Sequence, residues 1–121
     1  MNDYQEQLLE HYHNPRNFRN TSFVATHSAR SANLSCGDEI EIWLKVNKDG
    51  VIENVSFDGE GCSISIASTS LLLDSIKGKT ISEVNSLKDD YALSLIGIPL
   101  TMSRIKCALL PLDALKKSIQ D

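Results

Sequence analysis

The sequence predicts an α+β fold, in which a small antiparallel sheet of about three strands is covered on one side by helices. Three observations predict it. Residues 39–47 alternate apolar and polar side chains, as does a strand that buries one face. The turn sequence Asn-Lys-Asp-Gly at 47–50 is typical of a hairpin, and a returning strand pattern follows it. From residue 64 onward the patterns are helical, so the strands precede most of the helices.

Length and composition are those of an ordinary soluble globular protein. The 121 residues, 41% hydrophobic and 23% charged, suit one domain over 1–121 with a single core. The net charge of −4 gives no reason to expect nucleic acid as a partner. No apolar run approaches the roughly 20 residues that span a bilayer, and the acidic residues 1–10 do not resemble a signal peptide. We expect a cytoplasmic protein that binds neither nucleic acid nor membranes.

The first half of the chain contains a helix pattern and three strand patterns. An apolar stripe at helical spacing predicts a helix over residues 3–12, which the Asn14-Pro15 step ends. Residues 23–30 are a weaker strand candidate. The alternating segment 39–47 predicts the central strand, and the returning strand runs from Val51 to Gly59.

The second half predicts helices only. One helix covers 64–77, with Gly78 as its C-cap. Residues 80–83 have the form of a capping box, which starts another helix. A further helix covers about 89–96 and is closed by Gly97 and Pro99. The last helical stretch covers about 101–120, with a break or restart near Pro111, a residue suited to a first helical turn.

Three cysteines stand at the boundaries of these elements: Cys36 before the central strand, Cys62 between a strand and a helix, and Cys107 early in the last helix. Three cysteines cannot pair off within one chain, and free thiols persist in a reducing compartment. A helix start favours the thiolate. The arrangement therefore suits a pocket for a soft metal or persulfide sulfur, with Asp38 near enough to add an oxygen ligand. The alternatives are that the cysteines are inert buried thiols and that Asp38 merely caps a turn.

Other polar residues have simpler interpretations. The three histidines, His11, His13 and His27, are interpreted as structural or surface residues. Arg104 and Lys106 are either solvated charges or groups that stabilise Cys107 as an anion. Trp43 lies on the opposite face of its strand from Ile42 and Leu44; it covers the second side of the sheet or marks a partner or dimer surface. The serines between residues 63 and 70 are small residues that allow close helix packing.

Five segments together are specific for one family. They are His11-Tyr12-His13-Asn14-Pro15-Arg16-Asn17, Cys36-Gly37-Asp38, Gly59-Glu60-Gly61-Cys62-Ser63-Ile64-Ser65-Ile66-Ala67-Ser68-Thr69-Ser70, Lys77-Gly78-Lys79 and Arg104-Ile105-Lys106-Cys107-Ala108-Leu109-Leu110. With these segments, in the family's order and over nearly the whole length, the chain resembles the U-type iron–sulfur cluster assembly scaffolds: IscU, the N-terminal part of NifU, and SufU.

The resemblance implies a non-enzymatic scaffold that assembles and transfers [2Fe–2S] clusters. The transient cluster would be built from iron and sulfur on Cys36, Cys62 and Cys107, with Asp38 ligating or tuning it. Sulfur would come from a cysteine desulfurase similar to IscS or SufS, and apo iron–sulfur proteins would accept the cluster. We expect Cys36 to take the persulfide, because Gly37 lies beside it and no helix is predicted over its loop. A monomer or weak homodimer is expected.

A second function stays open, that of a zinc-dependent sulfur acceptor resembling SufU, with sulfurtransferase activity in partnership with the desulfurase. In it, Cys36 takes the sulfur and zinc holds the fold. The insertion that SufU carries before its third cysteine is absent, which favours the scaffold. Lys106 stands where IscU has histidine, which favours sulfur transfer. The chaperone-binding motif of IscU is also missing, since residues 99–103 read Pro-Leu-Thr-Met-Ser.

Overall fold

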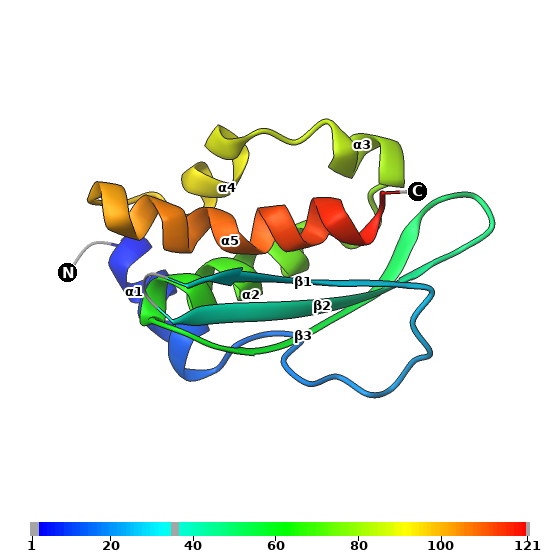
Figure 1. Ribbon diagram of the computed structural model, residues 1–121, viewed down its shortest axis with the longest axis horizontal. Helices are drawn as coiled ribbons and strands as arrows, with labels where there is room; N and C mark the ends of the chain where they lie inside the picture. Colours follow the sequence, from blue (N-terminus) through cyan, green and yellow to red (C-terminus); the bar gives the residue numbers. More distant parts are fainter. Residues whose placement is uncertain (1–2, 35–36, 121) are drawn as a thin grey trace.

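A three-stranded antiparallel sheet, ordered β1-β2-β3, forms one layer of the protein, and helices cover one of its faces (Figure 1). The computed structural model describes residues 3–34 and 37–120. The elements are α1 (Asp3–His13), β1 (His27–Asn33), β2 (Asp38–Val46), β3 (Ile52–Glu60), α2 (Ser63–Ile76), α3 (Ile81–Asn85), α4 (Asp89–Ile96) and α5 (Met102–Ser118). The predicted α+β fold is confirmed.

The alternation of β2 divides its side chains between the two faces of the sheet. Ile40, Ile42 and Leu44 are fully buried beneath α5, in one apolar cluster with residues of α2. The register runs from Asn33 opposite Asp38 to His27 opposite Leu44 on one side of β2, and from Glu60 opposite Glu39 on the other. Because β2 and β3 are antiparallel, the start of β2 and the end of β3 lie at the same end of the sheet.

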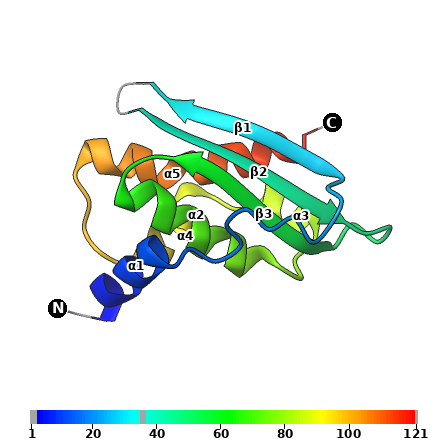
Figure 2. The ribbon, with the colours of Figure 1, turned by 90° about the horizontal axis from the view of Figure 1, so that it is seen from below.

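The outer face and the free edge of β3 are partly covered by the segment that connects α1 to β1, which Figure 2 shows in blue beside β3. Backbone hydrogen bonds join Arg19 N–H to the Phe57 carbonyl (2.8 Å) and Phe57 N–H to the Asn17 carbonyl (3.0 Å). Trp43 is half-buried on this face and lines a hollow of about 450 Å³ together with Phe23 and Ala25. Trp43 therefore meets the connecting segment on the second side of the sheet.

The helix boundaries follow local signals. The capping box before α3 is present: Thr80 Oγ1 accepts from Glu83 N–H, and Glu83 Oε1 accepts from Thr80 N–H, both at 3.1 Å. Gly97 closes α4 in the left-handed conformation (φ 70°). Among the described residues, none of the helices combines the length and apolar composition needed to cross a membrane.

Two expectations about the elements are wrong. A weak strand was expected at residues 23–30, but the corresponding strand, β1, spans His27–Asn33. The apolar Phe23 and Val24 suggested the earlier start, but β1 is fixed by its pairing with β2 and by buried Ser31, which donates to Asp113 Oδ2 on α5 at 2.5 Å. The break expected near Pro111 is absent, since α5 is continuous from Met102 to Ser118. The residues around Pro111 are buried, and packing of α5 on the sheet and on α2 keeps it in one piece.

Candidate metal and sulfur site

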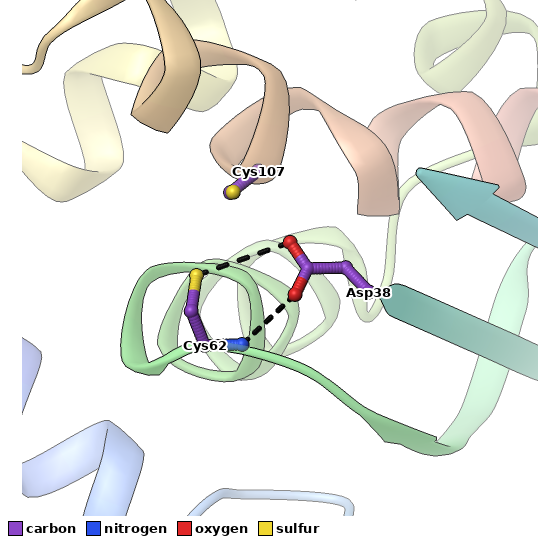
Figure 3. A group of neighbouring side chains, drawn as sticks. All are labelled: Asp38, Cys62 and Cys107. Atoms are coloured by element: carbon purple, nitrogen blue, oxygen red, sulfur yellow. Dashed lines mark hydrogen bonds between the residues drawn. The ribbon is translucent and has the colours of Figure 1, made fainter. Parts of the chain in front are cut away.

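Asp38, Cys62 and Cys107 meet at one end of the sheet, although they come from three different elements (Figure 3). Asp38 is the first residue of β2, Cys62 directly precedes α2, and Cys107 lies in the second turn of α5. One carboxylate oxygen and the two Sγ atoms all lie within 4.8 Å of one another. Two soft sulfur donors and one harder oxygen donor therefore converge, which is a ligand set for zinc or iron.

The carboxylate of Asp38 holds the start of α2 in place. Its Oδ1 accepts a hydrogen bond from the backbone N–H of Cys62 at 2.9 Å, while its Oδ2 lies 3.9 Å from the Cys62 thiol. Asp38 is only 1% exposed, so this carboxylate contacts protein rather than bulk water. The two sequence interpretations of Asp38, as a ligand and as a cap, are compatible, because different oxygens serve the two contacts.

Gly61 lets Asp38 approach Cys62 this closely. A Cβ atom at position 61 would lie 2.7 Å from Asp38 Oδ1 and would overlap the hydroxyl of Ser65. A larger residue would therefore displace the carboxylate or the first turn of α2. The glycine is needed for space, since its backbone is not in the left-handed region.

The thiol of Cys62 has a lowered pKa because of its place before a helix. Burial alone raises the pKa of this thiol, but hydrogen bonds outweigh it: the backbone N–H of Ser65 favours the thiolate, followed by the Cys107 thiol, the Ser65 hydroxyl and the backbone of Ile64. The Ser65 hydroxyl lies 3.8 Å from Cys62 Sγ and donates to the Cys62 carbonyl at 3.1 Å. More of this thiol is therefore ionised, and ready to bind metal, than in an ordinary cysteine.

Cys107 is buried on the inner side of α5, 3% exposed, with its Sγ 3.6 Å from the Ser103 carbonyl one turn earlier. Thr101 starts this helix, because its hydroxyl accepts from Arg104 N–H at 3.4 Å. Arg104 and Lys106 are exposed on the outer side. Lys106 lines an open groove of about 600 Å³ between α5 and the end of β1.

Cys36, the expected persulfide acceptor, lies outside the described residues. Its described neighbours are Leu34, which is 92% exposed, and Gly37, whose φ is 73°. Asn33 and Asp38, which flank this connection, are paired at the site end of the sheet. The expectation that Cys36 shares a pocket with Cys62 and Cys107 stays a prediction.

Among the described residues, no histidine belongs to the metal-ligand group of Asp38, Cys62 and Cys107. His11 is buried, with Nδ1 2.7 Å from the hydroxyl of Ser70, which also accepts from the backbone N–H of Arg16 at 2.7 Å. These contacts join α1 to α2 and give His11 the structural role expected for it. His13 is exposed, and His27 contacts the hydroxyl of neighbouring Thr26.

Sequence reasoning missed the contributions of Ser65 and Ser68 to the site. The serines were interpreted only as small packing residues. Ser65 is three residues after Cys62, a spacing that returns a side chain to the start of the first helical turn, so this role could have been found. Ser68 donates to the Ala108 carbonyl on α5 at 2.7 Å, and nothing local in the sequence indicates that contact.

The sequence matches one family model and several relatives that share the same name. The family model of NifU-like N-terminal domains matches residues 3–121. The chain is 36% identical to the iron–sulfur cluster assembly scaffold protein IscU of Buchnera aphidicola from Acyrthosiphon pisum, over 98% of this chain and 93% of the relative. It is 35% identical to the IscU scaffold protein of Escherichia coli K12, over 98% of this chain and 92% of the relative.

Solved structures share the fold. A putative iron–sulfur cluster assembly scaffold protein for the SUF system from Fervidobacterium islandicum superposes with a TM-score of 0.74 at 24% identity, covering 95% of both chains. The N-terminal part of a nitrogen-fixing NifU-like protein from Brucella abortus gives a TM-score of 0.71 at 21% identity, covering 96% of this chain and 91% of that one.

Proposed function

Since this chain belongs to the family of NifU-like N-terminal domains, we propose that it is a scaffold on which [2Fe–2S] clusters are assembled and from which they are transferred. The observation that carries the proposal is the convergence of Asp38, Cys62 and Cys107 within 4.8 Å. The chain covers nearly all of its IscU relatives, so the proposal concerns residues 1–121 as one scaffold domain.

The mixed donor set suits a cargo that must leave. A [2Fe–2S] cluster has four protein ligands, usually all thiolates. Cys36, Cys62 and Cys107 supply three, and Asp38 supplies a fourth that is harder and exchanges more readily. The lowered pKa of Cys62 helps loading, because the thiolate is the form that binds metal.

Sulfur would enter as a persulfide on Cys36, delivered by a cysteine desulfurase. The Cys36 thiolate attacks the terminal sulfur of the desulfurase persulfide; the new S–S bond forms on Cys36, and the desulfurase cysteine leaves as a thiolate. Reducing each transferred sulfur to sulfide takes two electrons, which a separate electron donor supplies. The exposure of neighbouring Leu34 supports an accessible acceptor. Apo iron–sulfur proteins would then receive the finished cluster.

Zinc binding with sulfurtransferase activity is the second candidate. Asp38, Cys62 and Cys107 fit three positions of a tetrahedral zinc site with Zn–S distances of about 2.3 Å, and the fourth position is available to Cys36. The feature that favours this candidate is Lys106, which stands where IscU has histidine. An ammonium group ligates no metal at neutral pH, so this position cannot supply the ligand that histidine would offer. Both candidates use the same thiols, and they differ in the bound metal and the final product.

The deciding experiment is anaerobic reconstitution with Fe²⁺, cysteine, a cysteine desulfurase and a reductant. We expect visible absorption and a Mössbauer spectrum of a [2Fe–2S] cluster, and transfer of that cluster to an apo-ferredoxin. Cys62→Ser and Cys107→Ser should fold but hold no stable cluster, while Ser63→Ala serves as the folded control. Mass spectrometry without iron should find the persulfide on Cys36. Stoichiometric zinc with a Cys36 persulfide but no cluster would instead establish the zinc-dependent sulfur acceptor.

A further inference from the structure

The spacing of the two described thiols depends on how two helices pack. Cys62 precedes α2, and Cys107 belongs to α5. The helices approach closely through small residues, because Ala67 on α2 and Ala108 on α5 are both fully buried in one apolar cluster. Anything that fixes the position of α5 against α2 also fixes the distance between the Cys62 and Cys107 sulfur atoms.

Ser68 makes a polar contact across this helix pair. Its side chain is 2% exposed, and its Oγ donates a hydrogen bond to the Ala108 carbonyl at 2.7 Å. Ala108 is the residue after Cys107, and Ser68 follows Cys62 by somewhat less than two helical turns. The bond therefore joins the helix that starts at one thiol to the backbone beside the other.

The Ala108 carbonyl can accept an outside donor because a carbonyl oxygen has two lone pairs, of which the bond within the helix uses one. The Ser68 hydroxyl reaches this carbonyl from α2 and so adds a directional bond to the apolar contacts of Ala67 and Ala108.

We propose that Ser68 is a positioning residue that sets the spacing of the Cys62 and Cys107 thiols through the Ala108 carbonyl. Ser68 acts through the backbone, because its hydroxyl donates to the Ala108 carbonyl. Without its hydroxyl, the two helices keep their apolar contacts but lose the bond that fixes their relative position. The inference rests on the proposed function only in that the positioned thiols are those proposed to hold the cluster.

The test compares Ser68→Ala with Ser118→Ala in metal-free protein titrated with Co²⁺. Ser118 is a matched control: it is 5% exposed and its hydroxyl donates at 2.6 Å to the Leu115 carbonyl, within its own helix at the far end of α5. Both variants delete one buried hydroxyl bonded to a backbone carbonyl. We expect Ser68→Ala to bind Co²⁺ about 10- to 100-fold more weakly, with weaker thiolate-to-metal absorption, as for other groups that support metal ligands. Ser118→Ala should bind like the wild type.

A second measurement reports thiol spacing without metal. In a Cys36→Ser background, dibromobimane fluoresces when it bridges Cys62 and Cys107. We expect less bridged product for Ser68→Ala than for Ser118→Ala. Equal Co²⁺ affinity and equal bridging in the two variants would overturn the proposal.

Should Ser68→Ala not fold, Ser68→Thr takes its place. The retained hydroxyl should keep wild-type Co²⁺ affinity, and a folded Ser68→Thr with a large loss of Co²⁺ affinity would contradict the positioning role.

These readouts separate the positioning role from the scaffold function. Failure of the wild type to assemble or transfer a cluster would end the scaffold proposal, while the Co²⁺ and bridging results would still decide the role of Ser68.

Discussion

Asp38 Oδ1 accepts the backbone N–H of Cys62 at 2.9 Å, while the Oδ2 of the same carboxylate faces the Cys62 sulfur at 3.9 Å. The strand that begins at Asp38 is thereby tied to the helix that begins after Cys62. One side chain both fixes the backbone of a candidate thiol ligand and offers an oxygen beside it, so its two roles can be separated by substitution.

Asp38→Asn and Asp38→Ala should separate these roles. Asparagine keeps an oxygen for the Cys62 N–H but loses the negative charge; alanine loses both. We expect both variants to hold a longer-lived cluster and transfer it more slowly, since the exchangeable carboxylate is gone. Only Asp38→Ala should also lose about 1–3 kcal/mol of unfolding free energy, because it leaves a buried N–H without its acceptor.

The measurements are cluster transfer to an apo-ferredoxin and urea unfolding of the metal-free proteins. Wild-type transfer rates in both variants, with a lower stability for Asp38→Ala, would reduce Asp38 to a structural cap.

Gly61→Ala should damage the site through Asp38. The added Cβ lies 2.7 Å from Asp38 Oδ1, so the carboxylate or the first turn of α2 has to move. We expect a loss of about 1–3 kcal/mol in stability together with weaker Co²⁺ binding. Gly50→Ala is the control: its left-handed φ of 79° also makes alanine costly, but Gly50 lies in the distant hairpin. Undiminished Co²⁺ affinity in Gly61→Ala would show that the space between Gly61 and Asp38 accommodates a methyl group.

The sequence predicted the elements whose signals are local. The alternation of residues 39–47 located β2 within one residue at each end, and the Thr80 capping box located the start of α3. β1 was misplaced because its buried position, Ser31, is polar and is stabilised by Asp113, which lies 82 residues away on α5. No local pattern can reveal such a contact.

The convergence of Asp38, Cys62 and Cys107 was predicted, while the place of Cys36 in the candidate site stays a prediction. Cysteines at element boundaries indicated that Cys62 and Cys107 converge near Asp38, because the ends of antiparallel strands and the helix that follows meet at one edge of a sheet. The bond from Ser68 to Ala108 was beyond reach, since it depends on the packing of α2 against α5. Pro111 was expected to break the last helix because its local effect was considered without the packing of α5 on α2 and the sheet.

The stability of the fold should fall in mild acid because of His11. Burial, and secondarily the nearby Arg16 charge, lower its pKa from the ordinary value of 6.5. Between that value and the lower pKa in the folded protein, the unfolded chain binds more protons. The contribution of neutral His11 to folding stability is thus fully present above pH 6.5 and is lost as the pH falls through the lower pKa of the folded protein. His11→Asn, which keeps a polar group near Ser70 but does not titrate, should lose this component.

Thermal midpoints measured from pH 7.5 down to pH 4.5 provide the test, with exposed His13→Asn as the control variant. We expect the thermal midpoints of the wild type and His13→Asn to fall in parallel below pH 6.5, and the midpoint of His11→Asn to fall less. Identical slopes in all three proteins would assign the acid sensitivity to other groups.

The reactivity of Cys62 should depend on the hydroxyl of Ser65. The pKa of Cys62 lies below its ordinary value of 9.0, even though burial opposes ionisation, and the Ser65 backbone and hydroxyl both contribute to the lowering. Iodoacetamide reacts with the thiolate, so the rate of alkylation follows ionisation. In metal-free Ser65→Ala, we expect the midpoint of the pH–rate profile to rise, while the remaining backbone N–H keeps part of the effect.

Mass spectrometry of the Cys62 peptide assigns the reaction to this thiol. The control is Ser63→Ala, which should keep the wild-type profile because the Ser63 hydroxyl does not contribute to the lowered pKa of Cys62. An unchanged midpoint in Ser65→Ala would leave the backbone N–H groups at the start of α2 and the Cys107 thiol as the causes of the lowered Cys62 pKa.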